Sequence, residues 1–475
     1  MTLRLVVRSL ASRPVRSAVL SCGFGFGIGV MAALLGVGQV ILEQARAVAV
    51  EGAGDVAIGG AAGAIGDARF LISGVLSLPP LAGRAAAASP SAETALTLVH
   101  RGKTTRVRAR GGIPSLERSL GDPETSGIAA WADTPADGRW SSPDPGDVLR
   151  AMDRFHPIPD APWRARSWAE WLYFNGRSRD GSARFYLTFL AGPRSGLGRR
   201  AAGVRLQLER AGRVSSYSTV AEVFEASLLE SAPDIEIGAN RVRLEGLRYR
   251  INLALDAEPK RTRAAAHDLM GEITLQAVAG RSIPPFAIRG ARGWVSGYVI
   301  PVLAGSVEGT LRAEGETIAF EDATGYHDHN WGFWEGVTWQ WGQVAHDDLS
   351  FVYGRVHPPP DAADPERLPG FLAVLGPSGP LGFSTNVLIE ETDTSPLGPS
   401  AGPRSIRVRA RGAEVQLDMD LTVESAIRTP MMGSFRSGSG AAMSFFQLRA
   451  LYRVRGRVAD RPIAFTTSGS AETFR

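Results

Sequence analysis

One short run concentrates side chains that could carry a proton, bind a metal ion or face an apolar ligand. Residues 325–332 read Gly-Tyr-His-Asp-His-Asn-Trp-Gly. Successive residues of an extended strand point to opposite faces. As a strand, this run presents one polar set on each face: Tyr326, Asp328 and Asn330 on one, and His327, His329 and Trp331 on the other. We expect this strand to mark the functional centre.

The face that carries Asp328 suggests acid catalysis. A carboxyl group among aromatic side chains loses solvation, which raises its pKa and keeps a proton on it near neutral pH. Asp328 could then act as a general acid, with Tyr326 and Asn330 orienting it. We take Asp328 and Tyr326 as the candidate catalytic residues.

The opposite face offers a different chemistry. His327 and His329 form a His-x-His pair, which could bind a metal ion if a third ligand such as Glu335, His346 or His357 joined it. No spacing in the sequence fixes that third ligand, so we predict no metal and no cofactor. The alternative to both chemistries is structural: these polar side chains could satisfy backbone groups where the chain enters a barrel.

Aromatic residues make up only 8% of the chain, yet they gather around this strand and one earlier segment. Seven of the ten tryptophans lie within residues 163–174 and 331–341. Large apolar walls with a few placed polar groups are typical of a cavity for an apolar ligand. The candidate ligand-binding residues are therefore Asn330, His327, His329, Trp331, Trp334, Trp339, Trp341, Trp171, Tyr173 and Glu170.

The elements that position these residues are short strands. Phe185, Leu187 and Phe189 alternate with polar residues, and the same pattern returns in residues 204–208 and 406–421. Residues 235–244 form a hairpin pattern around Gly238-Ala-Asn240. Period-two alternation with frequent turn signals favours barrels or sandwiches. The sequence predicts a mainly β protein.

The N-terminus carries a membrane signal. Residues 17–42 contain no charged side chain, and about 20 apolar residues suffice to span a bilayer as a helix. Four arginines precede the run, so the positive-inside rule places the N-terminus in the cytoplasm and the rest outside, in the periplasm of a two-membrane cell. We predict an uncleaved single-pass anchor. Cleavage near Ala45-Arg-Ala47 and a buried core helix are the alternatives.

Four regions follow from these patterns. Residues 1–50 contain the anchor, and residues 51–156 are a linker with some β structure, including a hairpin within Thr94–Ala109. We place the first barrel at 157–320 and the second at 321–475.

Several function classes fit poorly. The formal charge of +4 rests on arginines scattered among acids, without the clustering that nucleic-acid binding requires. The single cysteine, Cys22, excludes an intramolecular disulfide. No Gly-x-Ser-x-Gly, Walker or His-Glu-x-x-His motif occurs.

Two segments resemble a known family. Glu170-Trp-Leu-Tyr-Phe-Asn-Gly176 with Arg184-Phe-Tyr-Leu-Thr-Phe189, and the 325–332 run with Trp339-Gln-Trp-Gly342, are similar to motifs of the lipocalin-like carotenoid 1,2-hydratase (hydroxyneurosporene synthase) family. The resemblance covers about Pro159 to Arg475. It implies two consecutive lipocalin-like antiparallel β-barrels with the ligand cavity near their junction.

The same resemblance implies a reaction. Members add water to an isolated C=C of an acyclic carotenoid without a redox cofactor, and Asp328 matches their proposed proton donor, with Tyr326 beside it. The same barrel architecture also resembles that of cyclases, which use the cavity to fold a polyene. The chain departs from the family at Gly297-Tyr-Val-Ile-Pro-Val302, where a His and a Trp have no match.

Residues 3–47 resemble the first helix of an ABC exporter permease. Two functions therefore compete. The first is a hydro-lyase that hydrates or cyclises a long isoprenoid by acid catalysis. The alternative is a non-catalytic, membrane-anchored carrier of a lipid or other hydrophobic cargo, associated with an ABC exporter.

Overall fold

The computed structural model describes Val15, Ile58 and residues 68–77, 87–101, 103–122, 132–141, 143–258, 267–377, 379–392, 402–430 and 444–475. The anchor predicted at residues 17–42 lies outside these ranges and stays a prediction. Within them, no helix combines the length and hydropathy that a membrane span requires.

The chain divides into two compact units, residues 1–65 with 86–141 and residues 66–85 with 142–475. In the smaller unit, β1 (Ser91–His100) pairs with β2 (Lys103–Gly112), so the hairpin expected within Thr94–Ala109 is present. Two short helices follow, α4 (Pro114–Ser119) and α5 (Gly138–Ser141). Arg110 holds this unit together by pairing with the buried carboxylates of Glu117 and Asp122.

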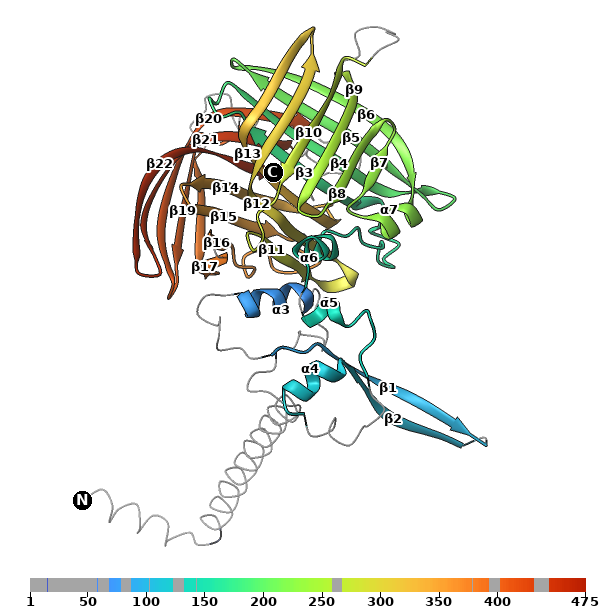
Figure 1. Cartoon of the computed structure of the whole chain (residues 1–475). Helices are drawn as coiled ribbons and strands as arrows, with labels where there is room; N and C mark the ends of the chain where they lie inside the picture. Colours follow the sequence, from blue (N-terminus) through green and yellow to red (C-terminus); the bar gives the residue numbers. More distant parts are fainter. Residues whose placement is uncertain are drawn as a thin grey trace, which may run out of the picture. The chain divides into compact units, whose positions relative to one another are not determined.

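The larger unit begins its β structure with an 11-stranded antiparallel sheet (Figure 1). Its strands are β3 (Trp168–Arg177), β4 (Ala183–Gly196), β5 (Arg199–Arg210), β6 (Arg213–Phe224), β7 (Ile235–Ile237), β8 (Asn240–Glu245), β9 (Arg248–Ala257), β10 (Leu269–Gln276), β11 (Ile283–Arg289), β12 (Val295–Ala313) and β13 (Glu316–Phe333). The sheet closes because β9 pairs with β10 on one side and with β6 and β8 on the other.

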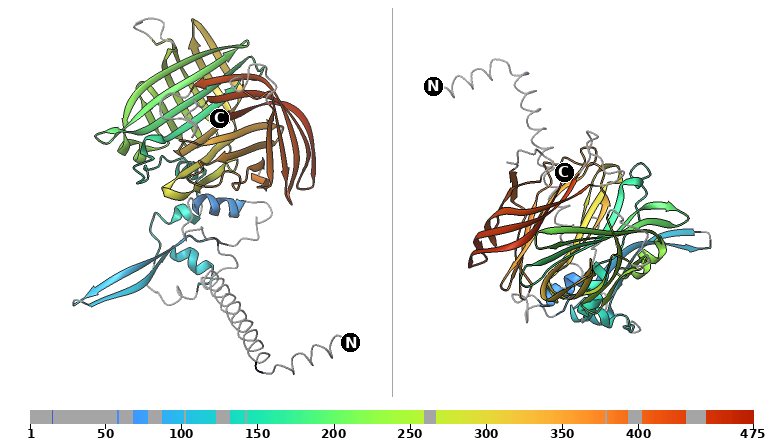
Figure 2. Two further views of the ribbon diagram at one scale, coloured as in Figure 1. Left: turned by 180° about the vertical axis from the view of Figure 1, so that it is seen from behind. Right: turned by 90° about the horizontal axis from the view of Figure 1, so that it is seen from above.

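A second sheet of nine antiparallel strands follows. Its strands are β14 (Thr338–His346), β15 (Leu349–His357), β16 (Phe371–Gly376), β17 (Gly379–Ser384), β18 (Val387–Thr392), β19 (Ser405–Arg411), β20 (Val415–Pro430), β21 (Ser444–Val458) and β22 (Arg461–Phe474). β17 and β18 are its edges, so this barrel is nearly closed. Figure 2 shows its curved strands, coloured brown to red.

Few helices accompany the barrels. They are α3 (Ala68–Ser77), α6 (Pro145–Met152), α7 (Glu225–Ser231) and the 3₁₀ turns η2 (Ala165–Ser167) and η3 (Ala291–Gly293). α6 begins at Asp144, whose side chain accepts hydrogen bonds from the backbone N–H groups of Gly146 and Asp147, as a helix N-cap does. The core of the first barrel includes Met152 and Phe155, so this barrel takes residues from before the predicted boundary at 157.

Alternation of apolar residues builds three separate cores. In β9, Tyr249, Ile251, Leu253 and Leu255 are buried and their neighbours in the first half of the strand are exposed. Such inward residues fill the first barrel, and a corresponding set fills the second. A third cluster, which includes Tyr173, Tyr298, Tyr326, Trp341 and Phe371, draws residues from both sheets and so packs the barrels against each other.

The prediction of a mainly β protein with two consecutive antiparallel barrels is confirmed, with one barrel closed and one nearly closed. The division between the sheets falls after Phe333, beyond the predicted 320/321. The reason is pairing: β13 is bonded to β12 along most of its length and to β3 from Thr324 to Phe333, and both strands belong to the first sheet. The 325–332 run therefore lies in β13, the last strand of the first barrel.

Candidate functional site

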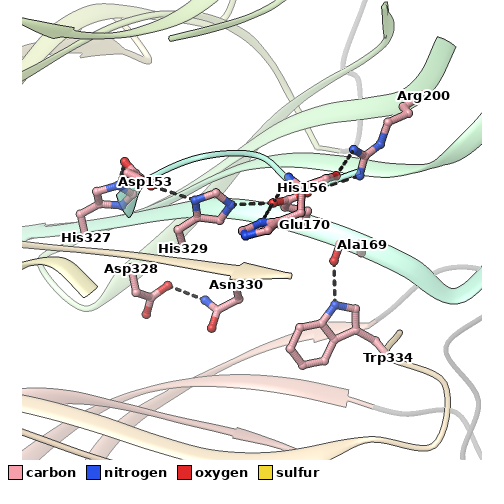
Figure 3. Close-up of polar contacts among 10 residues, drawn as sticks. All are labelled: Asp153, His156, Ala169, Glu170, Arg200, His327, Asp328, His329, Asn330 and Trp334. Atoms are coloured by element: carbon pink, nitrogen blue, oxygen red, sulfur yellow. Dashed lines mark hydrogen bonds and ion pairs between the residues drawn. The ribbon is translucent and has the colours of Figure 1, made fainter. Parts of the chain in front are cut away.

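β13 is buried on both of its faces over residues 325–333, apart from partial exposure at Asn330. Alternation sends Tyr326, Asp328 and Asn330 toward the second barrel and His327, His329 and Trp331 into the first. Figure 3 shows Asp328 and Asn330 on one side of the strand and the two histidines on the other. The sequence left open which face meets the cavity, and the structure places it on the side of Asp328.

Two direct donors hold Asp328, and one of them is itself held by a third. The indole Nε1 of Trp341 donates to the hydroxyl of Tyr326 (2.9 Å), and that hydroxyl donates to Oδ2 of Asp328 (2.8 Å). Nδ2 of Asn330 donates to Oδ1 (2.6 Å). Each carboxylate oxygen of Asp328 therefore accepts one hydrogen bond, and its orientation is fixed from both sides.

Burial dominates the electrostatics of this face. Asp328 is 2% exposed, and its loss of solvation raises its pKa to about 6, although Tyr326, His327 and Asn330 pull it down. Burial also raises the pKa of Tyr326 well above its ordinary value, and the neighbouring Asp328 adds to this. Asp328 can therefore exchange a proton within the physiological range, while Tyr326 stays a neutral donor.

A cavity of about 20 Å³ lies beside Asp328, between the two sheets. Eleven residues line it: Trp171, Ser296, Gly297, Tyr298, Asp328, Asn330, Trp334, Trp339, Trp341, Val356 and Glu472. A space of this size admits about one water molecule. Trp171 and Trp339 are only half-buried, with ring centroids 6.1 Å apart, so this part of the lining reaches the surface.

Glu472 brings a second carboxyl group to the same cavity, from β22 of the second barrel. It pairs across the ladder with Trp341 of β14, the residue that donates to Tyr326. Burial and the negative charge of Asp328 together raise the pKa of Glu472 to about 8, although hydrogen bonding from Tyr173 and Trp339 lowers it. Two buried carboxyl groups thus influence each other across the junction.

The other face of β13 belongs to a buried charge network, which we define as Asp153, His156, Glu170, Arg200, His327 and His329 (Figure 3). His329 is its centre: Nδ1 lies 2.8 Å from Oδ1 of Asp153 and Nε2 lies 3.0 Å from Oε1 of Glu170. His327 lies 3.0 Å from the other oxygen of Asp153. Both ring nitrogens of His329 thus face carboxylates.

The charges of this network compensate each other. Burial lowers the pKa of His329, but its two carboxylate partners outweigh burial and raise the pKa to about 9. Burial would raise the pKa of Asp153, but His327 and His329 reverse this and lower it. Glu170 also has a lowered pKa and lies 3.6 Å from the guanidinium of Arg200. His329 is therefore a buried cation between two carboxylates.

His156, Glu170 and His329 are close enough to share a metal ion, with ligand atoms within 4.8 Å of one another. The hydrogen bonding opposes that use, because an imidazolium ring that donates from both nitrogens has no free lone pair. Nδ1 of His156 is also bonded to Glu170 at 2.7 Å. The set fits a structural ion network better than a metal centre.

The structure separates the predicted site residues into three groups. Those that line the cavity are Trp171, Asp328, Asn330, Trp334, Trp339 and Trp341. Tyr326 and Tyr173 stand directly behind it. The remaining four, Glu170, His327, His329 and Trp331, face the first barrel; Trp331 stacks on His156 with ring centroids 4.0 Å apart. Pairing explains this, since Glu170 lies opposite Trp331 in the β3–β13 ladder.

Sequence reasoning missed Glu472, Tyr298, Asp153 and His156. Glu472 lies three residues from the C-terminus, remote from both aromatic windows, and a lone Glu in a strand gives no signal. Asp153 and His156 fall in the segment predicted as linker.

No family model matches the sequence, and no curated protein sequence is significantly similar to it. Among solved structures, a Nitrosomonas europaea protein assigned as AttH is 17% identical, with 67% of this chain and 97% of that chain covered and a TM-score of 0.41. The structure of CghA with Sch210972 is 13% identical, with 68% and 94% covered and a TM-score of 0.43. The structure of CghA alone is 13% identical, with 68% of this chain and 93% of that chain covered and a TM-score of 0.41. At such scores the likeness carries no argument about ligand or activity, which must come from the site itself.

Proposed function

We propose that this protein is a cofactor-free hydratase or cyclase that acts on an isolated C=C of a long isoprenoid in the cavity between its barrels. The observation that carries the proposal is Asp328. This carboxyl group is buried among tryptophans and tyrosines, is held by Tyr326 and Asn330, and has its pKa raised to about 6. The motif resemblance supports the same chemistry.

The reaction suits these surroundings. Protonating a trisubstituted alkene gives a tertiary carbocation, which the faces of nearby aromatic rings stabilise. Trp171, Trp334, Trp339 and Trp341 line the cavity and can surround such a cation. Capture by water gives a tertiary alcohol, whereas capture by another C=C of the same chain gives a ring. Both outcomes are redox-neutral.

The small cavity sets a condition on binding. Its 20 Å³ accommodates a water molecule but no isoprenoid end group. Trp171 and Trp339 are the partly exposed aromatic members of the lining, so we expect these two side chains to turn outward when a ligand binds. The reaction itself needs only the end of the chain inside, and the rest of the isoprenoid can stay outside or in a bilayer.

The test is incubation with lycopene, an acyclic carotenoid with an isolated double bond at each end, in water enriched in the heavy oxygen isotope. The native protein should yield a tertiary alcohol that carries the heavy oxygen, and Asp328→Asn should yield none. The matched control is Asp322→Asn, on the same strand but exposed to solvent. A lycopene that is bound without conversion would instead support the carrier function.

The carrier is the second candidate. It is supported by Gly297-Tyr-Val-Ile-Pro-Val302, which lacks the family's His and Trp, and by the permease-like N-terminus. Against it, a carrier must enclose much of its cargo, and a 20 Å³ cavity encloses none of it in this conformation.

Membrane attachment is part of both proposals. Residues 17–42 would anchor the chain, and the barrels would lie outside the cytoplasm, next to a bilayer that dissolves isoprenoids. Carbonate washing of membranes tests the anchor, and protease treatment of intact spheroplasts tests the side of the barrels. An ABC exporter would be a partner if its subunits co-purify with the detergent-solubilised protein.

A further inference from the structure

Glu472 is a buried acid that has no part in proton transfer from Asp328 to the alkene. It lines the same cavity as Asp328 but comes from the opposite barrel. Its exposed fraction is 9%, and that of Asp328 is 2%. Two carboxyl groups that share one cavity hold a proton between them more readily than two negative charges.

Two short hydrogen bonds stabilise the charged form of Asp328. The Tyr326 hydroxyl oxygen accepts a hydrogen bond from the Trp341 indole N–H, so the hydroxyl proton of Tyr326 points at Oδ2 of Asp328. The Asn330 amide donates to the other oxygen. Asp328 is therefore an acceptor on both oxygens, and such bonding favours the carboxylate form.

Glu472 lacks the cationic support of Asp328, whose ionisation His327 and His329 favour. Hydrogen bonding from Tyr173 and Trp339 favours the carboxylate form of Glu472, and the negative charge of Asp328 opposes it. Three neutral phenols also interact electrostatically with Glu472: those of Tyr326, Tyr353 and Tyr452. No Arg, Lys or His appears among these described neighbours of Glu472.

We propose that Glu472 is the catalytic proton donor of this cavity and that Asp328 is its carboxylate partner, which accepts a proton from the attacking water. The assignment rests on the proposed hydratase function and changes the role of Asp328 within it. The raised pKa of Glu472, about 8, and the lower value of about 6 for Asp328 agree with it. Environments that push two pKa values apart separate an acid from a base.

The steps balance. Glu472 gives its proton to the less substituted alkene carbon, and the π electrons form the new C–H bond. The water oxygen bonds to the tertiary cation, and one water proton passes to Asp328. Transfer of that proton from Asp328 to Glu472 restores the starting state, so the pair holds one proton before and after the turnover.

Infrared spectroscopy tests the assignment without substrate. At pH 7 the native protein should show the C=O band of a buried protonated carboxyl, and that band should be absent from Glu472→Gln. Asp328→Asn should keep the band and lose it at a lower pH than the native protein, because a negative neighbour has gone. Glu390→Gln, an exposed residue of the same barrel, should match the native protein.

The opposite result overturns the assignment: a band that survives in Glu472→Gln and disappears in Asp328→Asn puts the proton on Asp328. Absence of any band in the native protein also overturns it. Should Glu472→Gln fail to fold, the direction of the shift in Asp328→Asn decides alone, and an unshifted titration contradicts the proposal.

Turnover supplies a second readout. With lycopene, Glu472→Gln should lose about 10²–10⁴-fold in rate, as expected on loss of a general acid. If Glu472→Gln is as active as the native protein, the donor role is contradicted and the proposed function is not. Absence of product from the native protein contradicts the proposed function and the donor role with it, whereas the infrared result then still reports which carboxyl holds the proton.

Discussion

The hydroxyl of Tyr326 donates a 2.8 Å hydrogen bond to Asp328, two residues along the same face of β13. Strand geometry makes this pairing possible, since residues two apart share a face. Trp341, from the first strand of the second barrel, fixes the direction of the hydroxyl by donating to its oxygen. The contact therefore joins the last strand of one barrel to the first strand of the next, at the edge of the cavity.

Replacing Tyr326 by Phe should weaken catalysis without removing the carboxyl group. A hydrogen bond to a charged group contributes about 1.5–3 kcal/mol, so the rate of hydration should fall by roughly 10–100-fold. The bond from Tyr326 lowers the pKa of Asp328, so its loss should raise that pKa. With Asp328 as the carboxylate partner of Glu472, the acidic limb of the pH–rate profile should move upward. An unchanged profile would mean that Tyr326 only packs.

Asp328→Asn should change how stability depends on pH. The folded-state pKa of Asp328 is raised from 3.8 to about 6, so the folded protein holds this proton more tightly than the unfolded chain does. Its contribution to stability is complete below pH 3.8 and is lost as the pH rises through about 6. Between pH 4 and pH 8 the variant should therefore gain stability relative to the native protein, by about 3 kcal/mol at most.

Urea unfolding at both pH values measures this difference. Asp322→Asn serves as the control because Asp322 is exposed on the same strand. A difference between variant and native protein that does not change with pH would show that Asp328 titrates normally.

His329→Gln should destabilise the first barrel. The substitution leaves Asp153 and Glu170 without their buried cation, and breaking a buried ion pair costs about 3–5 kcal/mol. The pKa of His329 is raised from 6.5 to about 9, so its contribution is complete below pH 6.5 and is lost as the pH rises through about 9. Stability of the native protein should fall between pH 7 and pH 10, and that of the variant should fall less. The exposed His267→Gln is the control, and equal melting temperatures for all three proteins would refute a stabilising role.

Chelators should leave the protein unchanged. His329 uses both ring nitrogens on Asp153 and Glu170, so the His156–Glu170–His329 group has no prepared metal site. We expect elemental analysis to find no stoichiometric metal after purification without added ions. A zinc or iron content near one per chain that His329→Gln abolishes would show that the network is a metal centre after all.

Alternation made much of the fold readable from the sequence. Phe185, Leu187 and Phe189 predicted β4, and the pattern around Gly238 predicted the β7–β8 hairpin, because alternation of residue types follows the alternation of side chains along a strand. The boundary at 320 was placed too early, because strand pairing decides where one sheet ends and hydropathy does not record pairing. The alternation within 325–332 also predicted which residues share a face of the strand. Which face meets the cavity depends on tertiary packing, so the sequence left it open.

The site was readable only in part, for a physical reason. Asp328, Trp339 and Trp341 stand in one motif and could be named together. Glu472 reaches the cavity because β22 pairs with β14, and Asp153 reaches His329 across a separation of 176 residues. Such contacts are fixed by sheet register and by packing of the chain after α6, neither of which a single sequence displays.

The central claim is that the cavity at Asp328 adds water to an isolated isoprenoid double bond. The most direct measurement is mass spectrometry of lycopene after incubation with the native protein, Asp328→Asn and Asp322→Asn in water enriched in the heavy oxygen isotope. We predict a labelled tertiary alcohol with the native protein and Asp322→Asn and none with Asp328→Asn. Lycopene recovered unchanged from the native protein, or equal product from all three, would contradict the claim.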